Sequence, residues 1–253
     1  MVSGLRGKRA VVTGAGSGIG RATALELAAH GASVSVVDMN PRTADSVCEE
    51  ISSAGGIAHP HIADLRGEHA PSRVMADAVG ALGGIDILVN NAGVVGSAAG
   101  PAQATDEEWE DIMLTNVTAP FRLIRCAVPH MSGTGGSIVN VASAAGLRGS
   151  AAGTAYTVSK HALVGLTLSA AVYLRGQDIR VNAVSPGATL TNMRVPSRVE
   201  LQQDEKIIEC YRNNRGRVSH PHDIAHTILF LASDLARQVT GVVVPVDNGW
   251  NAV

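Results

Sequence analysis

The stretch from Lys8 to Gly31 constrains the fold of this chain more than any other part of its sequence. An apolar strand (KRAVVT) runs directly into the turn GAGSGIG, and an apolar-periodic helix (RATALELAAHG) follows. In such a unit, backbone N–H groups and the helix dipole point at an anion, and side chains would obstruct its approach. The glycines are spaced GxxxGxG, because Ile19 occupies the third glycine position of the stricter GxGxxG pattern. This stretch therefore predicts a phosphate-binding site.

The next apolar strand, Ser33–Asp38, ends on a carboxylate. An acid at this distance from the glycine turn can accept hydrogen bonds from ribose hydroxyls in a dinucleotide-binding fold. A 2′-phosphate would instead face the charge of Asp38. Two like charges about 4 Å apart repel by roughly 4 kcal/mol near a surface, at an effective dielectric constant of 20. Asp38 therefore favours NAD over NADP, and a merely solvated acid at a strand end is the alternative.

Short β-branched strands and helical segments alternate along the rest of the chain. Helical patterns cover residues 41–54, 67–82, 105–131 and 154–176, and apolar strands cover 56–64, 85–90 and 179–187. This alternation is typical of parallel strands joined by helical crossovers. The sequence contains no linker, repeat or low-complexity tract, and 253 residues suit one α/β domain. We predict one domain over residues 1–253, built on parallel strands joined by helical crossovers.

Composition excludes several classes of partner. The net charge is −2 without a basic run, which argues against nucleic acid and anionic membranes. Three widely spaced cysteines argue against a disulfide framework and suit a reducing compartment. The first residues lack the apolar core of a signal peptide, and no apolar run approaches membrane-spanning length. We expect a cytoplasmic protein that acts on a small molecule.

Tyr156 and Lys160 are the first candidate catalytic pair. They are four residues apart in a helical segment, so they share one face. A phenol with an ordinary pKa of about 10 is a poor base at neutral pH, but a neighbouring ammonium favours the phenolate. Ser143, at the end of the strand SIVNVAS, can offer a hydroxyl to the same substrate oxygen. The spacing alone also fits an ordinary amphipathic helix.

Asn116 is a further candidate inside the helical segment 105–131. Thr105 caps this segment, with Glu108 as its capping-box partner. Asparagine is neutral to unfavourable within a helix, and Pro120 removes the N–H bond to the carbonyl of Asn116. We expect a bend there that frees this carbonyl for a water molecule. A satisfied asparagine at a kink is the alternative.

Two segments near the carboxyl end of the sheet bear on ligand binding. Pro186 and Gly187 end the strand 179–187, so Thr189 and Thr191 should overhang the edge where open α/β sheets bind ligands. The polar, broken pattern from 194 to 217 predicts a mobile helical flap within the loop 188–217.

A rival motif, SHPHDIAH, places His222 and His226 four residues apart just after His220. It has no HExxH and no nearby Cys or Glu ligand, and its proline is typical of a helix start. We predict no metal site. A serine-hydrolase interpretation lacks a GxSxG motif.

Together, these motifs resemble the short-chain dehydrogenase/reductase family over nearly the whole chain. The matching elements are TGAGSGIG at 13–20, NNAG at 90–93, Asn116, Ser143, YxxxK at 156–160 and PG at 186–187. The chain departs from the family at Ser219, His222 and Asn248, where a glycine, an acid and a glycine are common. The resemblance implies a single Rossmann-type, doubly wound parallel sheet flanked by helices on both faces. It also implies an NAD(P)-dependent enzyme acting on CH–OH groups, often as a homotetramer, with a dimer as the alternative.

The resemblance also implies a catalytic tetrad. Tyr156 would be the general acid/base, and Lys160 would hold the nicotinamide ribose and lower the tyrosine pKa. Ser143 would orient the substrate oxygen, and Asn116 would hold the water of a proton relay. Asp64 would lie near the adenine, Asn91 near the ribose, and the two threonines near the nicotinamide amide. The residues predicted to contact the cofactor are Gly14, Ser17, Gly18, Ile19, Gly20, Asp38, Asp64, Leu65, Asn91, Ala92, Gly93, Tyr156, Lys160, Pro186, Gly187, Thr189 and Thr191.

The candidate walls of the substrate pocket are mostly apolar and include no evident arginine clamp for a carboxylate. They are Val94, Val95, Ala145, Leu147, Leu190, Val195 and Tyr211. We therefore predict an NAD-dependent oxidoreductase that interconverts a secondary alcohol and a ketone, with an apolar, alicyclic or steroid-like substrate. The alternatives are an NADPH-dependent 3-oxoacyl thioester reductase, against which Asp38 speaks, and a non-catalytic NAD-binding sensor or scaffold.

Overall fold

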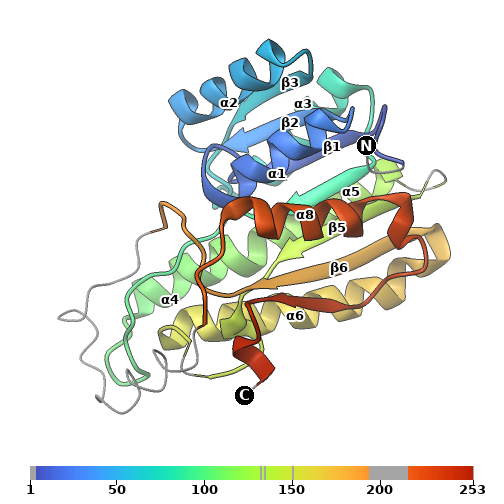
Figure 1. The fold of residues 1–253 in the computed structure, drawn as a ribbon. Coiled ribbons are helices and arrows are strands. Elements are labelled where there is room, and N and C mark those ends of the chain that lie inside the picture. Colours follow the sequence, from blue (N-terminus) through green and yellow to red (C-terminus); the bar gives the residue numbers. More distant parts are fainter. Residues whose placement is uncertain (1–3, 132, 134, 150, 194–215, 253) are drawn as a thin grey trace.

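The computed structural model describes residues 4–131, 133, 135–149, 151–193 and 216–252. In this part of the chain, a seven-stranded parallel sheet runs through the molecule in the order β3-β2-β1-β4-β5-β6-β7 (Figure 1). Its strands are β1 (Arg9–Thr13), β2 (Ser33–Asp38), β3 (Ile57–Ile62), β4 (Ile87–Asn90), β5 (Gly136–Val141), β6 (Ile179–Pro186) and β7 (Val243–Val246). The predicted doubly wound α/β fold is confirmed.

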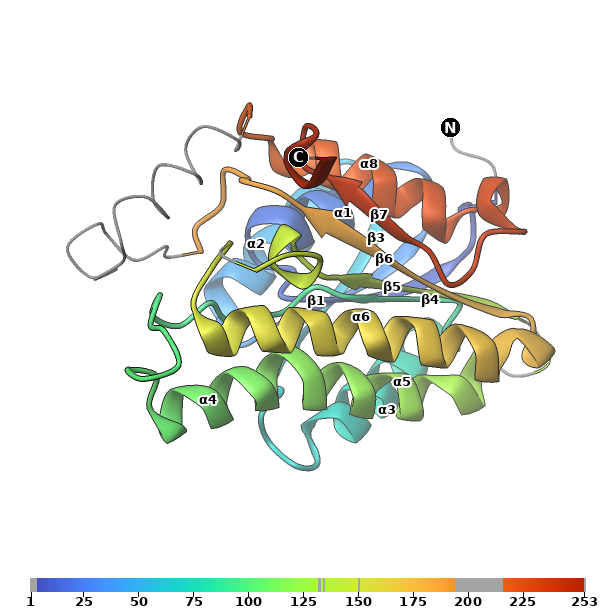
Figure 2. The same cartoon turned by 90° about the horizontal axis from the view of Figure 1, so that it is seen from below.

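Helices cover both faces of the sheet. One face carries α1 (Gly18–Ala29), α2 (Pro41–Ser53) and α8 (Pro221–Ala232). The other carries α3 (Ala70–Leu82), α4 (Asp106–Met113), α5 (Ala119–Met131) and α6 (Thr154–Leu174), as the edge-on view of Figure 2 shows. Each face holds its own buried apolar cluster, so the sheet separates two cores.

The apolar runs of the strands explain these two cores. Successive side chains of a strand point to opposite faces, so a strand buried on both sides needs apolar residues at every position. In β1, Ala10 and Val12 pack into the core beneath α1 and α8, while Val11 packs into the core beneath α3 and α5. In β4, Ile87 packs into the first of these cores and Leu88 into the second.

The observed helices differ from the predicted ones in two places. The segment 105–131 is interrupted by a π-helical turn, Leu114–Thr118, so the distortion lies at Asn116 itself and precedes Pro120. Such turns are rare and often occur at functional sites. The helix predicted over 67–82 begins at Ala70. Most of the predicted flap, residues 194–215, lies outside the described residues.

The order of the strands decides where a ligand can bind. The chain moves outward from β1 to β3, and then returns to the other side of β1 with β4. Open α/β sheets bind ligands at such a switch point, beyond the carboxyl ends of the strands. Thr13 ties the two central strands together there, because its Oγ1 accepts hydrogen bonds from the N–H groups of Asn91 and Ala92, each at 3.0 Å.

Candidate active site

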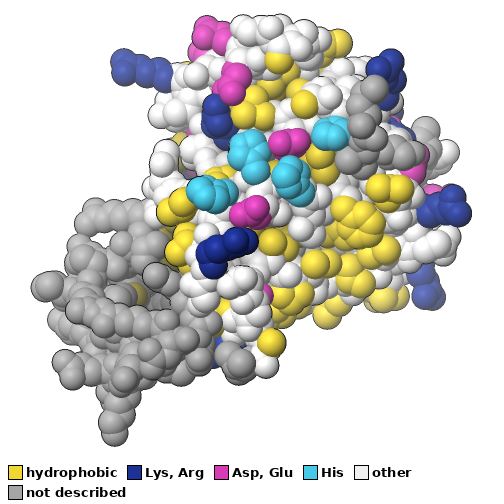
Figure 3. All heavy atoms as spheres, viewed as in Figure 1, with side chains coloured by type: hydrophobic (Ala, Val, Ile, Leu, Met, Phe, Trp, Pro, Cys, Tyr) yellow, Lys and Arg dark blue, Asp and Glu magenta, His cyan; other side chains and the backbone are white. Residues whose placement is uncertain are grey.

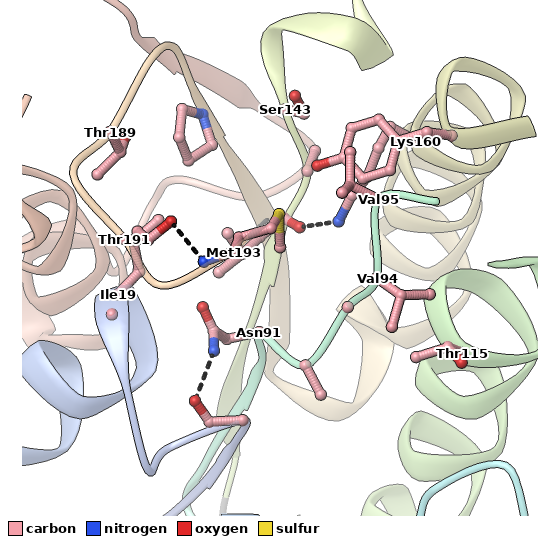
Figure 4. Close-up of a pocket in the computed structure, with 18 of the residues that line it drawn as sticks. Ile19, Asn91, Val94, Val95, Thr115, Ser143, Lys160, Thr189, Thr191 and Met193 are labelled. Carbon is pink, nitrogen blue, oxygen red and sulfur yellow. Dashed lines mark hydrogen bonds between the residues drawn. The ribbon is translucent and has the colours of Figure 1, made fainter. Parts of the chain in front are cut away.

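A cavity of about 850 Å³ lies at this switch point. Segments at the carboxyl ends of β1 to β7 line it, together with the first two turns of α6 (Figure 4). The structure places every residue predicted for the cofactor at this cavity except Gly20. Ser143, Tyr156 and Lys160 of the predicted tetrad line it as well, while Asn116 does not. One cavity therefore joins the glycine turn to the candidate catalytic residues.

The glycine turn is shaped to receive a phosphate. Gly14 and Gly18 adopt left-handed backbone conformations, with φ of 61° and 54°. A Cβ atom on Gly14 would lie 2.9 Å from the Cα of Ala92, so the turn approaches the end of β4 too closely for any side chain. Ser17, the N-cap of α1, makes no side-chain capping hydrogen bond, and the first turn of α1 contains no acid. The uncapped helix start thus fits the pyrophosphate of a dinucleotide.

Gly20 has a packing role instead of a place at the cavity. A Cβ atom there would lie 2.2 Å from the carbonyl oxygen of Gly14 and 2.5 Å from Nδ2 of Asn91. Because glycine has no side chain, the first turn of α1 can pack directly against the backbone of Gly14. Gly20 does not line the cavity, so its contact with the cofactor stays a prediction, and close packing explains why this position needs a glycine.

We expect Gly20→Ala to lower the free energy of unfolding by about 1–3 kcal/mol, as overpacking of a rigid site does. For a chain of this size, the thermal midpoint should fall by several degrees. Gly80→Ala is the matched control, because Gly80 lies on α3 with no atom near its Cβ position. That control should be neutral or stabilising, since glycine is unfavourable within a helix. Equal midpoints for both variants in a thermal melt would contradict the packing role.

Asp38 lies at the carboxyl end of β2, where the predicted ribose-binding acid belongs. Its Oδ2 accepts a hydrogen bond from Gly16 N at 2.9 Å, and its Oδ1 accepts one from Asn40 N at 3.0 Å. These two backbone bonds fix the carboxylate beside the glycine turn. Both oxygens keep lone pairs for further donors.

Asp64 lies at the cavity beyond β3 and forms part of an ion-pair network. Arg66 donates to Asp64 at 2.7 Å and to Asp111 of α4 at 2.7 Å. The hydrogen bond from Arg66 lowers the pKa of the Asp64 carboxyl. Because these side chains are more than 40% exposed, the network contributes little to stability, and its role here is to fix the loop after β3.

The amide of Asn91 holds the glycine turn against β4. Its Nδ2 donates to the carbonyl oxygens of Thr13 at 2.8 Å and Gly14 at 3.1 Å. Figure 4 shows the side chain of Asn91, which follows β4 directly, hydrogen-bonded to this turn. Asn91 therefore fixes the geometry of the glycine turn, the predicted phosphate site.

Asn116 is buried and turned toward the backbone of Val94. Its Oδ1 accepts from Val94 N at 2.9 Å, and its Nδ2 donates to the carbonyl oxygen of Val94 at 2.9 Å and to Ser159 Oγ at 3.0 Å. The side chain thus clamps the loop after β4 to α6. This arrangement explains why a polar residue is retained within the π-helical turn.

Tyr156 and Ser143 meet at the other end of the cavity. Ser143 caps the turn after β5, where its Oγ accepts a hydrogen bond from Ala145 N at 3.1 Å. Burial raises the pKa of the Tyr156 phenol, and a hydrogen bond with Ser143 opposes that rise. The Ser143 hydroxyl is therefore already directed at the oxygen that would exchange a proton.

Lys160 lies one turn along α6 from Tyr156, but its ammonium points elsewhere. The Nζ atom donates to the carbonyl oxygen of Val141 at 2.9 Å and lies 5.5 Å from the centre of the Tyr156 ring. Burial lowers the pKa of Lys160 to about 8. The expectation that Lys160 lowers the pKa of Tyr156 is not met, because desolvation of the phenol outweighs other influences on it.

The remaining walls of the cavity correct the predicted substrate pocket. Val94 and Val95 line it, whereas Ala145, Leu147 and Leu190 do not, and Val195 and Tyr211 lie outside the described residues. Sequence reasoning missed several contributors from loops and the C-terminal region: Ser97, Ala98, Thr115, Ala151, Ala152, Gly153, Met193 and Trp250. Of these residues, only Thr115 lies beside a position that the sequence singled out, the asparagine at 116 within a helical segment.

The three departures from the family pattern have local explanations. Ser219 pairs with the segment at Thr189 through hydrogen bonds from Leu190 N at 3.0 Å and to Ala188 O at 2.9 Å. Asn248 adopts a left-handed conformation with φ of 55°, which asparagine tolerates better than most residues.

His222 belongs to a group of histidines that gathers over α1 and α8 on the face shown in Figure 3. Its Nδ1 lies 3.1 Å from Oε1 of Glu26, and Nε2 of His226 lies 3.7 Å from the same oxygen. Among the described residues, no group of three or more potential ligands is arranged to hold a metal ion. The histidines therefore surround a carboxylate on the surface, away from the cavity.

The doubly wound sheet, uncapped glycine turn and strand-end acid define a Rossmann-type nucleotide-binding protein. A family model described as "Enoyl-(Acyl carrier protein) reductase" matches residues 14–251. A 3-oxoacyl-[acyl-carrier-protein] reductase of Thermotoga maritima is 36% identical over 246 residues, covering 97% of this chain and 98% of that protein. A 2,5-dichloro-2,5-cyclohexadiene-1,4-diol dehydrogenase of Sphingobium indicum is 38% identical over 257 residues, covering 100% of both. The chain belongs to the short-chain dehydrogenase/reductase family, a family of NAD(P)-binding oxidoreductases.

Solved structures agree with this assignment. A short-chain dehydrogenase of Mycobacterium paratuberculosis, bound to NAD, superposes with a TM-score of 0.90 at 32% identity, covering 99% of this chain and 100% of that one. A protein of Beutenbergia cavernae, described as an NAD(P)-dependent gluconate 5-dehydrogenase with bound NADP at low occupancy, gives 0.87 at 36% identity and covers 99% of each chain. Among the described helices, none combines the length and apolar composition needed to cross a bilayer.

Proposed function

We propose that this protein is an NAD-dependent oxidoreductase that interconverts a neutral secondary alcohol and a ketone, with Tyr156 as the general acid/base. One observation carries the proposal. The cavity that begins at the glycine turn and Asp38 ends at a buried tyrosine, which is hydrogen-bonded to Ser143 and lies one helical turn from Lys160. The residues proposed to bind the nucleotide and the group proposed to transfer the proton thus line the same cavity.

The division of labour follows from these residues. The nicotinamide, when bound, supplies or accepts the hydride. In oxidation, Tyr156 removes the proton of the alcohol hydroxyl, and in reduction it returns a proton to the ketone oxygen. The Ser143 hydroxyl holds the same substrate oxygen. Lys160 would hold the ribose hydroxyls of the cofactor with the N–H groups that do not donate to Val141, and Asn116 keeps the loop after β4 in place.

The preference for NAD rests on Asp38. Its carboxylate is fixed by two backbone N–H groups, so it cannot easily turn away from a 2′-phosphate. One of the two structural neighbours binds NAD and the other NADP. Because the Thermotoga maritima relative is a 3-oxoacyl-[acyl-carrier-protein] reductase, an NADPH-dependent 3-oxoacyl reductase is the second candidate function. The charge of Asp38 favours the first candidate.

The distribution of charge around the cavity supports a neutral substrate. Among the described lining residues, the charged ones other than Lys160 are Asp38, Asp64 and Arg66. Asp38 ends β2, and the other two lie in the loop after β3. The described lining residues that do not belong to β2 or to the loop after β3 are mostly apolar or small, and include Val94, Val95 and Ala152. Of the lining residues that the structure describes, Lys160 is the only cation outside the loop after β3 that a carboxylate or phosphate of the substrate could meet.

The test is nicotinamide absorbance on the purified protein, with NAD and NADP in parallel, across a panel of secondary alcohols and the matching ketones. Turnover with NAD and neutral cyclic alcohols would support the proposal. Turnover with NADPH and a 3-oxoacyl thioester would support the second candidate instead. NADH binding without turnover of any substrate would favour the alternative of a non-catalytic sensor.

The pKa of Tyr156 predicts opposite pH profiles for the two directions. Burial raises that pKa, so the phenol stays protonated through neutral pH. Oxidation needs the phenolate, so kcat/KM for the alcohol should rise with pH, by up to about tenfold per unit below the tyrosine pKa. Reduction needs the phenol, so kcat/KM for the ketone should stay level near neutrality and fall at alkaline pH. Initial rates from pH 6 to 10 at constant ionic strength test this, and an oxidation rate that falls with pH would contradict it.

We also propose that residues 1–253 form one domain that assembles as a homo-oligomer, as the predicted tetramer requires. Helix α6 exposes apolar side chains that a monomer would leave in water: Leu168 is 46% exposed, Val172 59% and Tyr173 81%. We expect Val172→Asp to reduce the molar mass measured by light scattering after gel filtration. Ile57→Asp, at an exposed apolar position of β3, is the control and should leave the mass unchanged. A monomeric parent protein would remove the proposal.

A further inference from the structure

The C-terminal residues reach the end of the cavity where the substrate would react. Trp250 lines the cavity and is 7% exposed, in a short 3₁₀ turn (Trp250–Ala252) after β7. Figure 1 shows this turn beside the segment that follows β5, which carries Ser143. A large aromatic residue from the C-terminal region therefore lines the same cavity as Ser143 and Tyr156.

Two contacts fix the place of Trp250. Nη1 of Arg148 donates to the carbonyl oxygen of Trp250 at 2.6 Å, and Arg148 lies only five residues after Ser143. On the other side, the turn packs against the end of β6, because a Cβ atom on Gly187 would lie 2.8 Å from the Cβ of Asp247. Trp250 is thus held between the loops after β5 and β6, across the sheet from Asp38 and Asp64.

Hydrogen bonds to Asp247 fix the backbone of the 3₁₀ turn Trp250–Ala252 and the residue before it. Oδ1 of Asp247 accepts from Gly249 N at 3.1 Å, and Oδ2 accepts from Asn251 N at 2.9 Å. Asp247 is 6% exposed, so these bonds are shielded from water. A side chain whose backbone is fixed in this way can present a defined surface to a ligand at little entropic cost.

We propose that Trp250 contacts the substrate and makes the site selective for neutral alcohols that carry a ring, and that Arg148 is the positioning residue that holds it. An indole offers a wide apolar face, which suits a cyclic carbon skeleton better than a short chain. The absence of charged side chains at this end of the described cavity, apart from Lys160, fits the same substrates. This inference rests on the proposed function.

Fluorescence tests the contact without requiring turnover. The chain has two tryptophans, and Trp109 on α4 is 40% exposed and does not line the cavity. In Trp109→Phe, the emission comes from Trp250 alone. Cyclohexanol added to this variant with saturating NADH should change the emission, whereas 2-propanol at the same concentration should not. No change at saturating cyclohexanol would overturn the proposal.

Kinetics test the selectivity. Trp250→Ala should lower kcat/KM for cyclohexanol by about tenfold, mainly through KM, and leave 2-propanol within about threefold. Its NADH dissociation constant should match that of the parent protein, which distinguishes a lost substrate contact from a damaged fold. Arg148→Met should show the same selective rise in KM, and Arg148→Lys, which keeps a donor, should restore part of it. An equal loss on both alcohols in Trp250→Ala would overturn the assignment.

The two levels of inference fail in different ways. Turnover of neither alcohol, with the Trp250 emission still responding to cyclohexanol, would remove the proposed function and keep the contact. Turnover of both alcohols with unchanged selectivity in Trp250→Ala would remove the contact and keep the function.

Discussion

Tyr156→Phe should lower kcat about 10²- to 10⁴-fold in both directions, the usual contribution of a positioned general acid/base. The substitution removes only the phenolic oxygen, so the buried ring still packs at the start of α6. Ser143 loses its hydrogen-bond partner, but the glycine turn and Asp38 are untouched. The dissociation constant for NADH, measured by its fluorescence, should therefore stay within a few-fold of the parent value.

Tyr173→Phe is the matched control for this change. It makes the same substitution on the same helix, but Tyr173 is 81% exposed and lies outside the cavity. Its rates should equal those of the parent protein. If Tyr156→Phe kept more than about a tenth of the parent kcat, another group would have to be the base.

Asp38→Asn should shift the cofactor preference toward NADP. The amide keeps an oxygen that can accept from Gly16 N, so the glycine turn should hold its shape. What it removes is the charge that faces a 2′-phosphate, a repulsion of up to roughly 4 kcal/mol at close range. We expect the ratio of kcat/KM for NAD to that for NADP to fall about 10²- to 10³-fold, because each 1.4 kcal/mol corresponds to about tenfold.

Asp111→Asn separates a local effect of Asp38 from a change in net charge. Asp111 also carries a negative charge on the side of the molecule that includes the loop after β3, where it pairs with Arg66, but it does not line the cavity. This variant should keep the parent ratio. A parent protein that already prefers NADP would contradict the role given to Asp38 before any variant is made.

The sequence by itself determined the fold class and most of the cavity. Strands such as β1 read as continuous apolar runs because both of their faces are buried, and that pattern is visible without coordinates. The glycine turn, Asp38 and the segment Asn91–Gly93 each follow a strand directly. In a parallel sheet, the carboxyl ends of the strands share one edge, so residues in these positions must come together.

Tertiary structure decided what each side chain faces. Gly20 and Asn116 lie on helical segments that were predicted, yet neither lines the cavity. Gly20 leaves room for the carbonyl oxygen of Gly14, and Asn116 hydrogen-bonds to the backbone of Val94. The pKa of Tyr156 depends on burial, which the spacing to Lys160 cannot reveal. Trp250 reaches the cavity only because β7 pairs with β6 and delivers the C-terminal turn beside Gly187. Local spacing fixes which helix or strand a residue occupies, whereas contacts between distant segments require the packed chain.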